Sequence, residues 1–143
     1  MFLGEFSHSL DAKGRITIPA RFRDELEQGV VLTPGYEQCL TIFPQAQFAA
    51  LSNKISEMSY AKELTRLYQR RMFGRAFEAS LDKLGRVLVP TVLREYAGID
   101  SEAVIVGLDT HFEIWQPERW SDCVALQDQN LEAMLAEASR SGV

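Results

Sequence analysis

The chain contains a tandem duplication, which limits its possible folds more than any other feature. The segment 6–23 recurs as 77–94, at an offset of 71 residues. Identical residues in the two copies include Phe, Ser, Leu, Asp, Gly, Arg and Pro, and the apolar positions match in kind. A weaker likeness follows, where Leu40–Phe43 corresponds to Phe112–Trp115. The pattern predicts two copies of one unit of about 55 residues, each with little core of its own.

Each copy has the pattern of a strand, a turn and a returning strand. Alternating apolar and polar residues before Asp11 predict the first strand. Asp11 and Gly14 are the residues favoured at the first and last positions of a tight turn, and glycine there accepts a positive φ angle. The Asp11 carboxylate is placed to accept the backbone N–H two residues later, in an Asx turn. Asp82 and Gly85 predict the same turn in the second copy.

A short helix and a second hairpin follow the returning strand. Pro19 and Pro90 suit the first turn of a helix, since proline lacks only an N–H that would be unpaired there. In the first copy, residues 30–33 and 39–43 predict a hairpin around Pro34-Gly35. Because pairing the two copies would bury a shared core and remove sheet edges, we expect one closed β-barrel.

The remaining segments have helical spacing of apolar residues. Between the copies a helical pair is predicted, with a break near Ser59-Tyr60, and after Pro117 a C-terminal helix interrupted near 127–129. The chain therefore divides into a first repeat, an inter-repeat helical segment, a second repeat, and a C-terminal helix with its tail: residues 1–55, 56–76, 77–122 and 123–143. The expected fold class is mainly β with helices (α+β).

The charge distribution allows a local basic surface in an acidic chain. The net charge is −5, which by itself argues against nucleic acid. However, residues 109–143 hold seven acidic and two basic residues, whereas residues 1–108 hold 13 of each. No apolar run approaches the roughly 20 residues of a membrane helix, and the N-terminus lacks a secretory pattern. We expect a cytoplasmic protein without a membrane partner.

Patterns typical of catalysis or metal binding are absent from the sequence. Cys39 and Cys123 form no disulfide framework and are read as reduced thiols among apolar residues. Aspartic proteases need Asp-(Thr/Ser)-Gly twice, and neither Asp11 nor Asp82 is followed by that pattern. Ser7-His8-Ser9 lies on a predicted strand, where neighbouring side chains point to opposite faces and make a poor triad. We expect no enzyme activity, no cofactor, no metal and no small-molecule substrate.

The two copies of Asp-x-x-Gly-Arg-(apolar-x-apolar)-Pro resemble the core of AbrB/SpoVT-type DNA-binding domains. Over essentially its full length the chain resembles the MraZ family of bacterial regulators. This resemblance implies a pseudo-symmetric swapped-hairpin barrel and sequence-specific binding of double-stranded promoter DNA. It further implies nucleoid association, usually repression of a division and cell-wall gene cluster, and self-assembly into a ring, often of eight subunits. Tandem short promoter repeats are the expected target of such a ring.

The candidate DNA-contacting residues are the cations in and just after the two turns: Lys13, Arg15, Lys83 and Arg86. A guanidinium donates bidentately to guanine in the major groove, whereas lysine suits phosphate as a point charge. The candidate turn-supporting residues are Asp11, Gly14, Asp82 and Gly85. We expect both aspartates to cap their turns and orient the arginines. The two turns are not expected to be equivalent, because Lys13 corresponds to Leu84 and Ala12 to Lys83.

Several alternatives remain open from the residues alone. Arg15 has the alternative role of an ion-pair partner for Asp11, and Arg23 and Arg94 fit either ion pairing or DNA contact. A basic stripe at helical spacing suits either a second DNA surface or a solvated face: Lys62, Arg66 and Arg70. Two acidic residues on the last predicted helix, Asp128 and Glu132, suit a contact between subunits. A ring-forming protein-interaction module without a DNA role is the alternative function.

Overall fold

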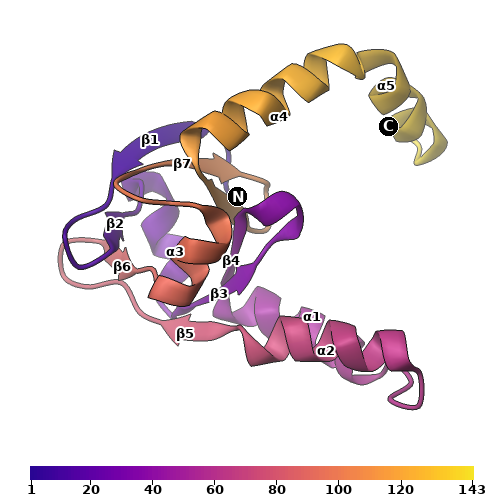
Figure 1. Cartoon of the computed structure of the whole chain (residues 1–143), viewed down its shortest axis with the longest axis horizontal. Helices are drawn as coiled ribbons and strands as arrows, with labels where there is room; N and C mark the ends of the chain where they lie inside the picture. Colours follow the sequence, from indigo (N-terminus) through magenta and orange to yellow (C-terminus); the bar gives the residue numbers. More distant parts are fainter.

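A computed structural model describes all residues, 1–143, and shows strands of both repeats woven together with two pairs of helices projecting from them (Figure 1). The strands are β1 (Glu5–Ser9), β2 (Arg15–Thr17), β3 (Val30–Pro34), β4 (Leu40–Pro44), β5 (Phe77–Ala79), β6 (Arg86–Leu88), β7 (Glu102–Gly107) and β8 (Phe112–Trp115). The helices are the 3-10 helix η1 (Ala20–Leu26), α1 (Gln45–Ser56), α2 (Glu63–Gly74), α3 (Thr91–Ala97), α4 (Pro117–Gln129) and α5 (Leu131–Arg140). The mainly β fold with helices is confirmed.

The strand order shows that the two repeats exchange strands. Six strands form one antiparallel sheet in the order β1-β7-β8-β4-β3-β5, and β2 pairs with β6 in a separate sheet. β1 pairs with β7 of the other repeat, and its counterpart β5 pairs with β3. β4 and β8, which are also counterparts, meet at the centre. The order is therefore symmetric under exchange of the repeats, and each repeat completes the sheet of the other.

The expected closure into one barrel is not observed. β1 and β5 remain the edges of the six-stranded sheet. Backbone groups that flank β2 and β6 bond to each other and not to the six-stranded sheet. Ile18 donates its N–H to the carbonyl of Gly85, and Val89 donates its N–H to the carbonyl of Gly14, both at 2.9 Å. Only an isolated bridge at Ile16 ties this pair to the end of β1. The pair therefore covers the core by packing rather than by continuing the sheet.

Apolar residues of both repeats share one core of 19 buried side chains. The inner face of the β2/β6 pair contributes Ile16 and Val87, which are fully buried. Phe22 of η1 packs edge-on against Phe2 at 5.0 Å between ring centroids and lies 5.3 Å from Phe112. Such aromatic contacts add to the free energy of burying apolar area. The two turns that flank β2 and β6 are thus mounted on a packed support.

The β3–β4 hairpin is present, but its turn lies three residues beyond the predicted one. β3 runs through Pro34, and the chain reverses at Glu37 and Gln38, which have φ angles of 56° and 59°. Gly35 donates its N–H to the carbonyl of Cys39 at 2.7 Å and thereby extends the hairpin past the predicted turn. Neither turn residue is Gly, Asn or Asp, the usual markers of positive φ, so the turn could not be located from composition.

The two helical pairs extend away from the sheets. The predicted break between α1 and α2 is confirmed, and the C-terminal interruption falls at Asn130, between α4 and α5. Asp128 and Glu132 therefore lie on different helices, and their predicted spacing on one helix face is wrong. No side chain of α4 or α5 is buried, and α5 lies away from the body in Figure 1. None of the helices combines the length and apolar character needed to cross a membrane.

Candidate nucleic-acid interface

The β2/β6 pair has one buried face and one outward face. Its antiparallel register places three sets of residues opposite each other: Ile16 with Val87, Arg15 with Leu88, and Thr17 with Arg86. Successive side chains on a strand point to opposite faces, so the buried Ile16–Val87 pair leaves the other two pairs pointing outward. Both motif arginines therefore share the outward face of one two-stranded ribbon.

Each arginine is held by the aspartate of its own turn. Asp11 Oδ1 accepts the backbone N–H groups of Lys13 and Arg15, both at 2.9 Å, and Oδ2 accepts the Nε–H of Arg15 at 2.7 Å. Asp82 makes the same set of bonds in the second turn and holds the Nε of Arg86 at 2.8 Å. The predicted Asx turns are present, and each carboxylate orients a guanidinium as well as capping the turn.

The ion pairs leave the ends of both guanidinium groups available to a ligand. The Nη atoms of Arg15 and Arg86 make no hydrogen bond within the protein, and Nη1 of Arg86 lies 3.8 Å from Asp11 Oδ2 across the repeats. The Arg15 and Arg86 side chains are 32% and 27% exposed. A guanidinium fixed through Nε keeps donors for planar acceptors such as a phosphate or the edge of a guanine. Arg15 does pair with Asp11, as the alternative required, but the pairing does not use up its donors.

The turn glycines are required by φ, and each lies against an arginine of the opposite repeat. Gly14 and Gly85 have φ angles of 85° and 75°. A Cβ on Gly14 would lie 2.8 Å from the guanidinium of Arg94, and one on Gly85 would lie 2.3 Å from that of Arg23. Each of these two arginines donates its Nε–H to a backbone carbonyl of its own repeat at 2.9 Å. Arg23 and Arg94 therefore brace the turns across the repeats, which gives them a structural role.

Hydrogen bonding lowers the pKa of both turn aspartates. The backbone N–H of Arg15 is the main cause for Asp11, whose pKa is lowered from 3.8 to about 2, and the Arg15 side chain adds to the effect. The backbone N–H of Arg86 lowers the pKa of Asp82 in the same way. Such bonds favour the ionised carboxylate, so both aspartates are charged at neutral pH.

Acid should weaken the fold through these turns. Because the folded-state pKa of Asp11 is below its ordinary value of 3.8, the ionised carboxylate stabilises the folded state fully above about pH 4, and this stabilisation is lost as the pH falls toward 2. In urea titrations at stepped pH, wild type should lose free energy of unfolding more steeply over this window than Asp11→Asn. Asp128→Asn, which removes an exposed carboxylate without a hydrogen-bond partner, should follow wild type. Equal slopes for wild type and Asp11→Asn would contradict the role of Asp11.

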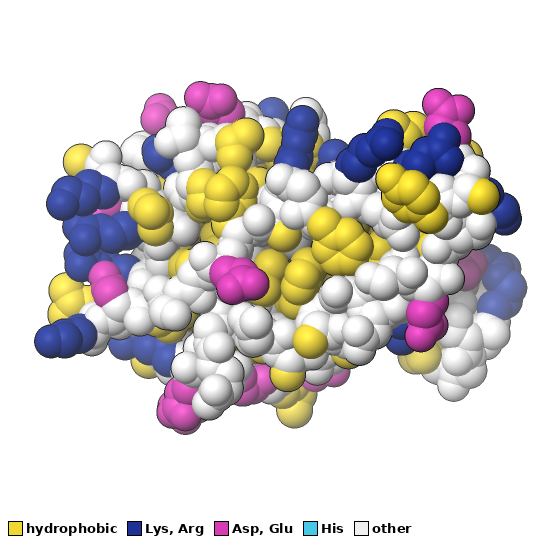
Figure 2. Space-filling view, turned by 90° about the horizontal axis from the view of Figure 1, so that it is seen from below, with side chains coloured by type: hydrophobic (Ala, Val, Ile, Leu, Met, Phe, Trp, Pro, Cys, Tyr) yellow, Lys and Arg dark blue, Asp and Glu magenta, His cyan; other side chains and the backbone are white.

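The two candidate lysines lie exposed in the turns, at different positions. Lys13 and Lys83 form no ion pair, and the site that corresponds to Lys13 carries Leu84, which is also exposed. Figure 2 shows Lys and Arg side chains gathered at the end of the molecule where β2 and β6 lie, on the left in both views. The four predicted cations thus belong to one surface, which we call the ribbon face: the outward side of β2 and β6 with the two adjoining turns.

The stripe on α2 is a different surface. Arg66 donates to the carbonyls of Tyr60 and Ala61, both at 3.0 Å, and thereby ties α2 to the loop that precedes it. Arg71, which lies beside the stripe, is not among the candidate residues predicted from the sequence. It donates to Tyr96 Oη at 2.6 Å and to the carbonyl of Gly35 at 3.0 Å. α2 is therefore tied to α3 by Arg71, whereas Lys62 and Arg70 have no partner in the chain.

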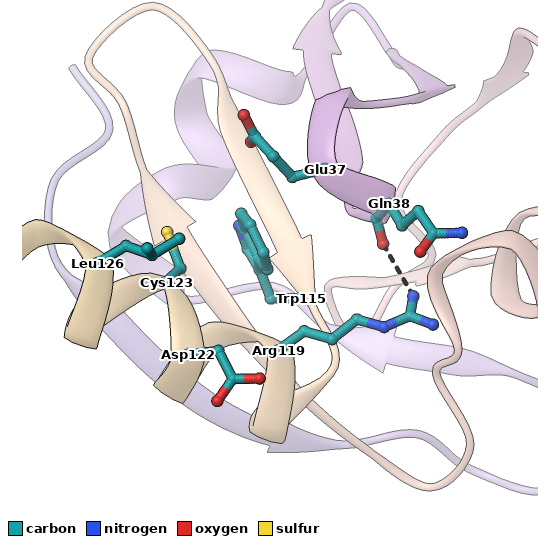
Figure 3. A pocket seen from close by; sticks show the side chains of 7 residues that line it. All are labelled: Glu37, Gln38, Trp115, Arg119, Asp122, Cys123 and Leu126. Carbon is teal, nitrogen blue, oxygen red and sulfur yellow. Dashed lines mark hydrogen bonds between the residues drawn. The ribbon is translucent and has the colours of Figure 1, made fainter.

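A pocket of about 340 Å³ lies where α4 leaves the body (Figure 3). Trp115 forms its inner wall, and Arg119 reaches across it to donate to the carbonyl of Gln38 at 3.2 Å. The ring of Trp120 on α4 lies 5.5 Å from the ring of Trp115 on β8, between centroids. The hydrogen bond from Arg119 joins α4 to the β3–β4 turn, so we interpret the pocket as the place where α4 is attached to the body.

The two cysteines are free thiols in different surroundings. Cys39 is fully buried, and desolvation raises the pKa of its thiol well above the ordinary range, so it stays protonated and unreactive. Cys123 is a separate free thiol on α4. No group of three or more His, Cys, Asp or Glu side chains is placed to hold a metal ion.

Comparison with known proteins identifies relatives over most of the chain. A family described as "MraZ protein, putative antitoxin-like" matches twice, over residues 1–71 and 72–140. A protein of Roseiflexus castenholzii is 48% identical over 130 residues, which is 91% of either chain. A protein of Carboxydothermus hydrogenoformans is 47% identical over 85% of either chain, and one of Pediococcus pentosaceus is 38% identical over 92% of either chain. Each of these three bears the name "Transcriptional regulator MraZ".

The double match coincides with the duplication and with the interleaved strands of the two repeats. The identities exceed one third over nearly the whole length of both chains. The chain belongs to the MraZ family.

Proposed function

We propose that this protein is a transcription regulator that binds double-stranded DNA sequence-specifically through the ribbon face. The observation that carries the proposal is the pair of arginines, Arg15 and Arg86, each fixed through Nε by an aspartate, with Nη atoms that make no hydrogen bond within the protein. The name of the relatives, transcriptional regulator, supports the same class. No catalytic role is proposed.

The shape of the ribbon face suits the major groove. That groove is about 12 Å wide and admits a two-stranded β-ribbon, with side chains of the outward face meeting base edges. Arg15 and Arg86 lie at opposite ends of the paired segment, on its outward face, and are the proposed base-reading residues. Lys13 and Lys83 lie in the flanking turns, where the sugar-phosphate strands border the groove, and are proposed to bind phosphate.

Because the total charge is acidic, DNA has to meet a locally basic surface, and the ribbon face is the proposed one. Thirteen acidic residues lie in positions 1–108 and seven in the rest, whereas on the ribbon face four cations outnumber two ionised aspartates, which pair with the two arginines. Four or fewer phosphate contacts per subunit give a weak single footprint. Affinity for a promoter then has to come from several subunits acting together.

Self-assembly into a ring, of the octamer type that the family resemblance suggests, supplies such subunits. Exposed apolar side chains support an assembly contact on the projecting helices: Leu126, Leu131, Met134 and Leu135 on α4 and α5, and Leu64 and Leu67 on α2. A closed ring is built from contacts between unlike surfaces, and two separate apolar helix pairs provide them. The proposed target is a series of short direct repeats about 10 base pairs apart, so that each meets the same side of the ring.

The proposed operator lies in the promoter region of the protein's own gene cluster, and the expected effect is repression in the cytoplasm at the nucleoid. The test is fluorescence anisotropy of wild type with a labelled duplex of that region, against a scrambled duplex of equal length, in 0.15 M salt. We expect at least a tenfold preference for the promoter duplex. Equal affinity for both duplexes would refute sequence-specific regulation and would favour the ring-forming protein-interaction module.

Assembly should multiply the affinity for tandem repeats. Leu135→Glu places a charge on the apolar face of α5 and should reduce the molecular mass measured by light scattering to that of smaller species. Its affinity for a tandem array should fall by about 100-fold or more, because linked sites bind at millimolar effective concentration, while its affinity for a single repeat stays unchanged. Glu137→Gln, an exposed position elsewhere on α5, is the matched control. A smaller species that still binds the array as tightly as wild type would contradict the role of avidity.

A further inference from the structure

The ribbon face carries an exposed leucine that the core does not explain. Leu88 of β6 lies directly opposite Arg15 in the antiparallel register and is 51% exposed. Its neighbours along the strand, Val87 and Val89, point inward and are fully buried. A leucine on the outward side of the ribbon therefore lies outside the buried core, and its partner across the ribbon is a cation.

The pseudo-symmetry of the repeats makes this position informative. The residue that corresponds to Leu88 in the first repeat is Thr17, which lies opposite Arg86. Each arginine consequently has a different partner across the ribbon: Arg15 is beside a branched apolar side chain, and Arg86 is beside a hydroxyl. The two halves of the ribbon face share their arginine and aspartate but differ in the residue that lies opposite the arginine.

We propose that Leu88 is a specificity-determining residue that contacts the 5-methyl group of a thymine next to the base read by Arg15. This inference rests on the proposed DNA-binding function. Thymine is the one base that presents a methyl group in the major groove, and apolar side chains are the groups that contact it. Directly opposed side chains on a β-ribbon are about 5 Å apart at Cβ, which is comparable with the rise of about 3.4 Å between stacked base pairs. Leu88 and Arg15 therefore reach neighbouring base pairs.

Leu84 provides a contrast within the same surface. It is 64% exposed, yet it lies in the flanking turn at the position of Lys13 rather than on the ribbon. From there it faces the border of the groove, where phosphates rather than methyl groups are presented. The half of the site around Arg15 is therefore the one that combines a bidentate donor with a methyl contact, and the operator repeat is read asymmetrically.

The test replaces thymine by deoxyuridine, which removes only the methyl group. The promoter duplex and its fully deoxyuridine-substituted form are each titrated with wild type, Leu88→Ala, Leu88→Thr and Leu84→Ala, with anisotropy as the readout. For wild type we expect binding of the substituted duplex to be weaker by three- to fivefold for each repeat bound, which corresponds to one buried methyl group per subunit. Leu88→Ala, whose side chain is too short to reach the base, should lose most of this difference. Leu88→Thr keeps a methyl group and should retain part of it, and Leu84→Ala should keep all of it.

The outcomes separate this inference from the function on which it rests. Specific binding by wild type that is indifferent to the substitution would overturn the role of Leu88 and leave the proposed DNA binding intact. An unchanged deoxyuridine penalty in both Leu88 variants would assign the methyl contact to another residue and would also overturn it. Binding that does not distinguish promoter from scrambled DNA would refute the DNA-binding function itself and this inference with it.

Discussion

Replacing both Arg15 and Arg86 by alanine is expected to abolish specific DNA binding while the protein stays folded. A bidentate contact to a base contributes about 1–3 kcal/mol of discrimination, so the two together amount to about 2–6 kcal/mol, or roughly 30- to more than 1,000-fold in affinity. The fold should tolerate the change, because both side chains are partly exposed and both aspartates keep their bonds to backbone N–H groups. Anisotropy with promoter and scrambled duplexes measures the loss.

Two comparisons make that experiment specific. Arg140→Ala removes an exposed arginine from α5, far from the ribbon face, and should bind like wild type. The salt dependence gives a second readout, since log affinity falls with log salt by about 0.9 for each phosphate neutralised. If the arginines read bases, the double variant should lose its preference for the promoter with little change in slope. A double variant that keeps wild-type preference would remove the basis for the site.

Gly85→Val should damage the site through the backbone although Arg86 is still present. Valine disfavours the observed φ of 75°, which costs about 1–3 kcal/mol, and its Cβ would meet the Arg23 guanidinium at 2.3 Å. For a chain of this size the φ term alone lowers the melting temperature by about 4–12 °C. Displacing Arg23 removes the brace between the repeats, so promoter affinity should also fall by tenfold or more.

Gly74→Val is the matched control for this variant. A Cβ at Gly74 meets nothing within 4 Å, and the residue lies at the end of α2, away from the ribbon face. It should keep both the melting temperature and the DNA affinity of wild type within a small margin. Wild-type stability and affinity in Gly85→Val would contradict the account of the turn. Calorimetry and anisotropy on the same samples decide between these results.

The local chemistry of the turns could be predicted from the sequence, because it depends on few neighbouring residues. Asp11 and Gly14 lie three positions apart and define the turn between them, and Asp82 and Gly85 repeat this pattern in the second copy. The partner of each turn could not be predicted in the same way. Arg23 packs on Gly85, which is 62 positions away in the chain, and only the pairing of β2 with β6 brings them together.

Register was the main quantity that sequence pattern did not provide. The duplication predicted that the repeats pair, but which residues face each other across β2 and β6 depends on the tertiary fold. In the sequence, Leu88 is only the middle residue of the apolar-x-apolar pattern, whereas the register places it opposite Arg15. The closed barrel was wrong for a related reason: duplication indicates pairing of the copies, but it does not fix which strand edges remain open.

For the helices, too, the local features were predictable from the sequence and the contacts between distant elements were not. Breaks near Ser59-Tyr60 and near 127–129 were predictable because apolar spacing fails there, and the structure confirms both. The link from Arg71 to Tyr96 was not, since a lone arginine in a basic helix has no pattern that distinguishes it from its solvated neighbours. Contacts between distant elements become visible only when the fold places those elements together.

The most direct test of the central claim is chemical probing of guanine N7 in the major groove of the promoter duplex. Dimethyl sulfate methylates this atom, which is also the acceptor that a bidentate arginine occupies. Wild type should protect a guanine in each repeat, and the Arg15→Ala/Arg86→Ala variant, at a concentration that still saturates the duplex non-specifically, should leave those guanines reactive. Guanines that stay fully reactive beneath bound wild type, or protection that persists in the double variant, would contradict major-groove reading by the ribbon face.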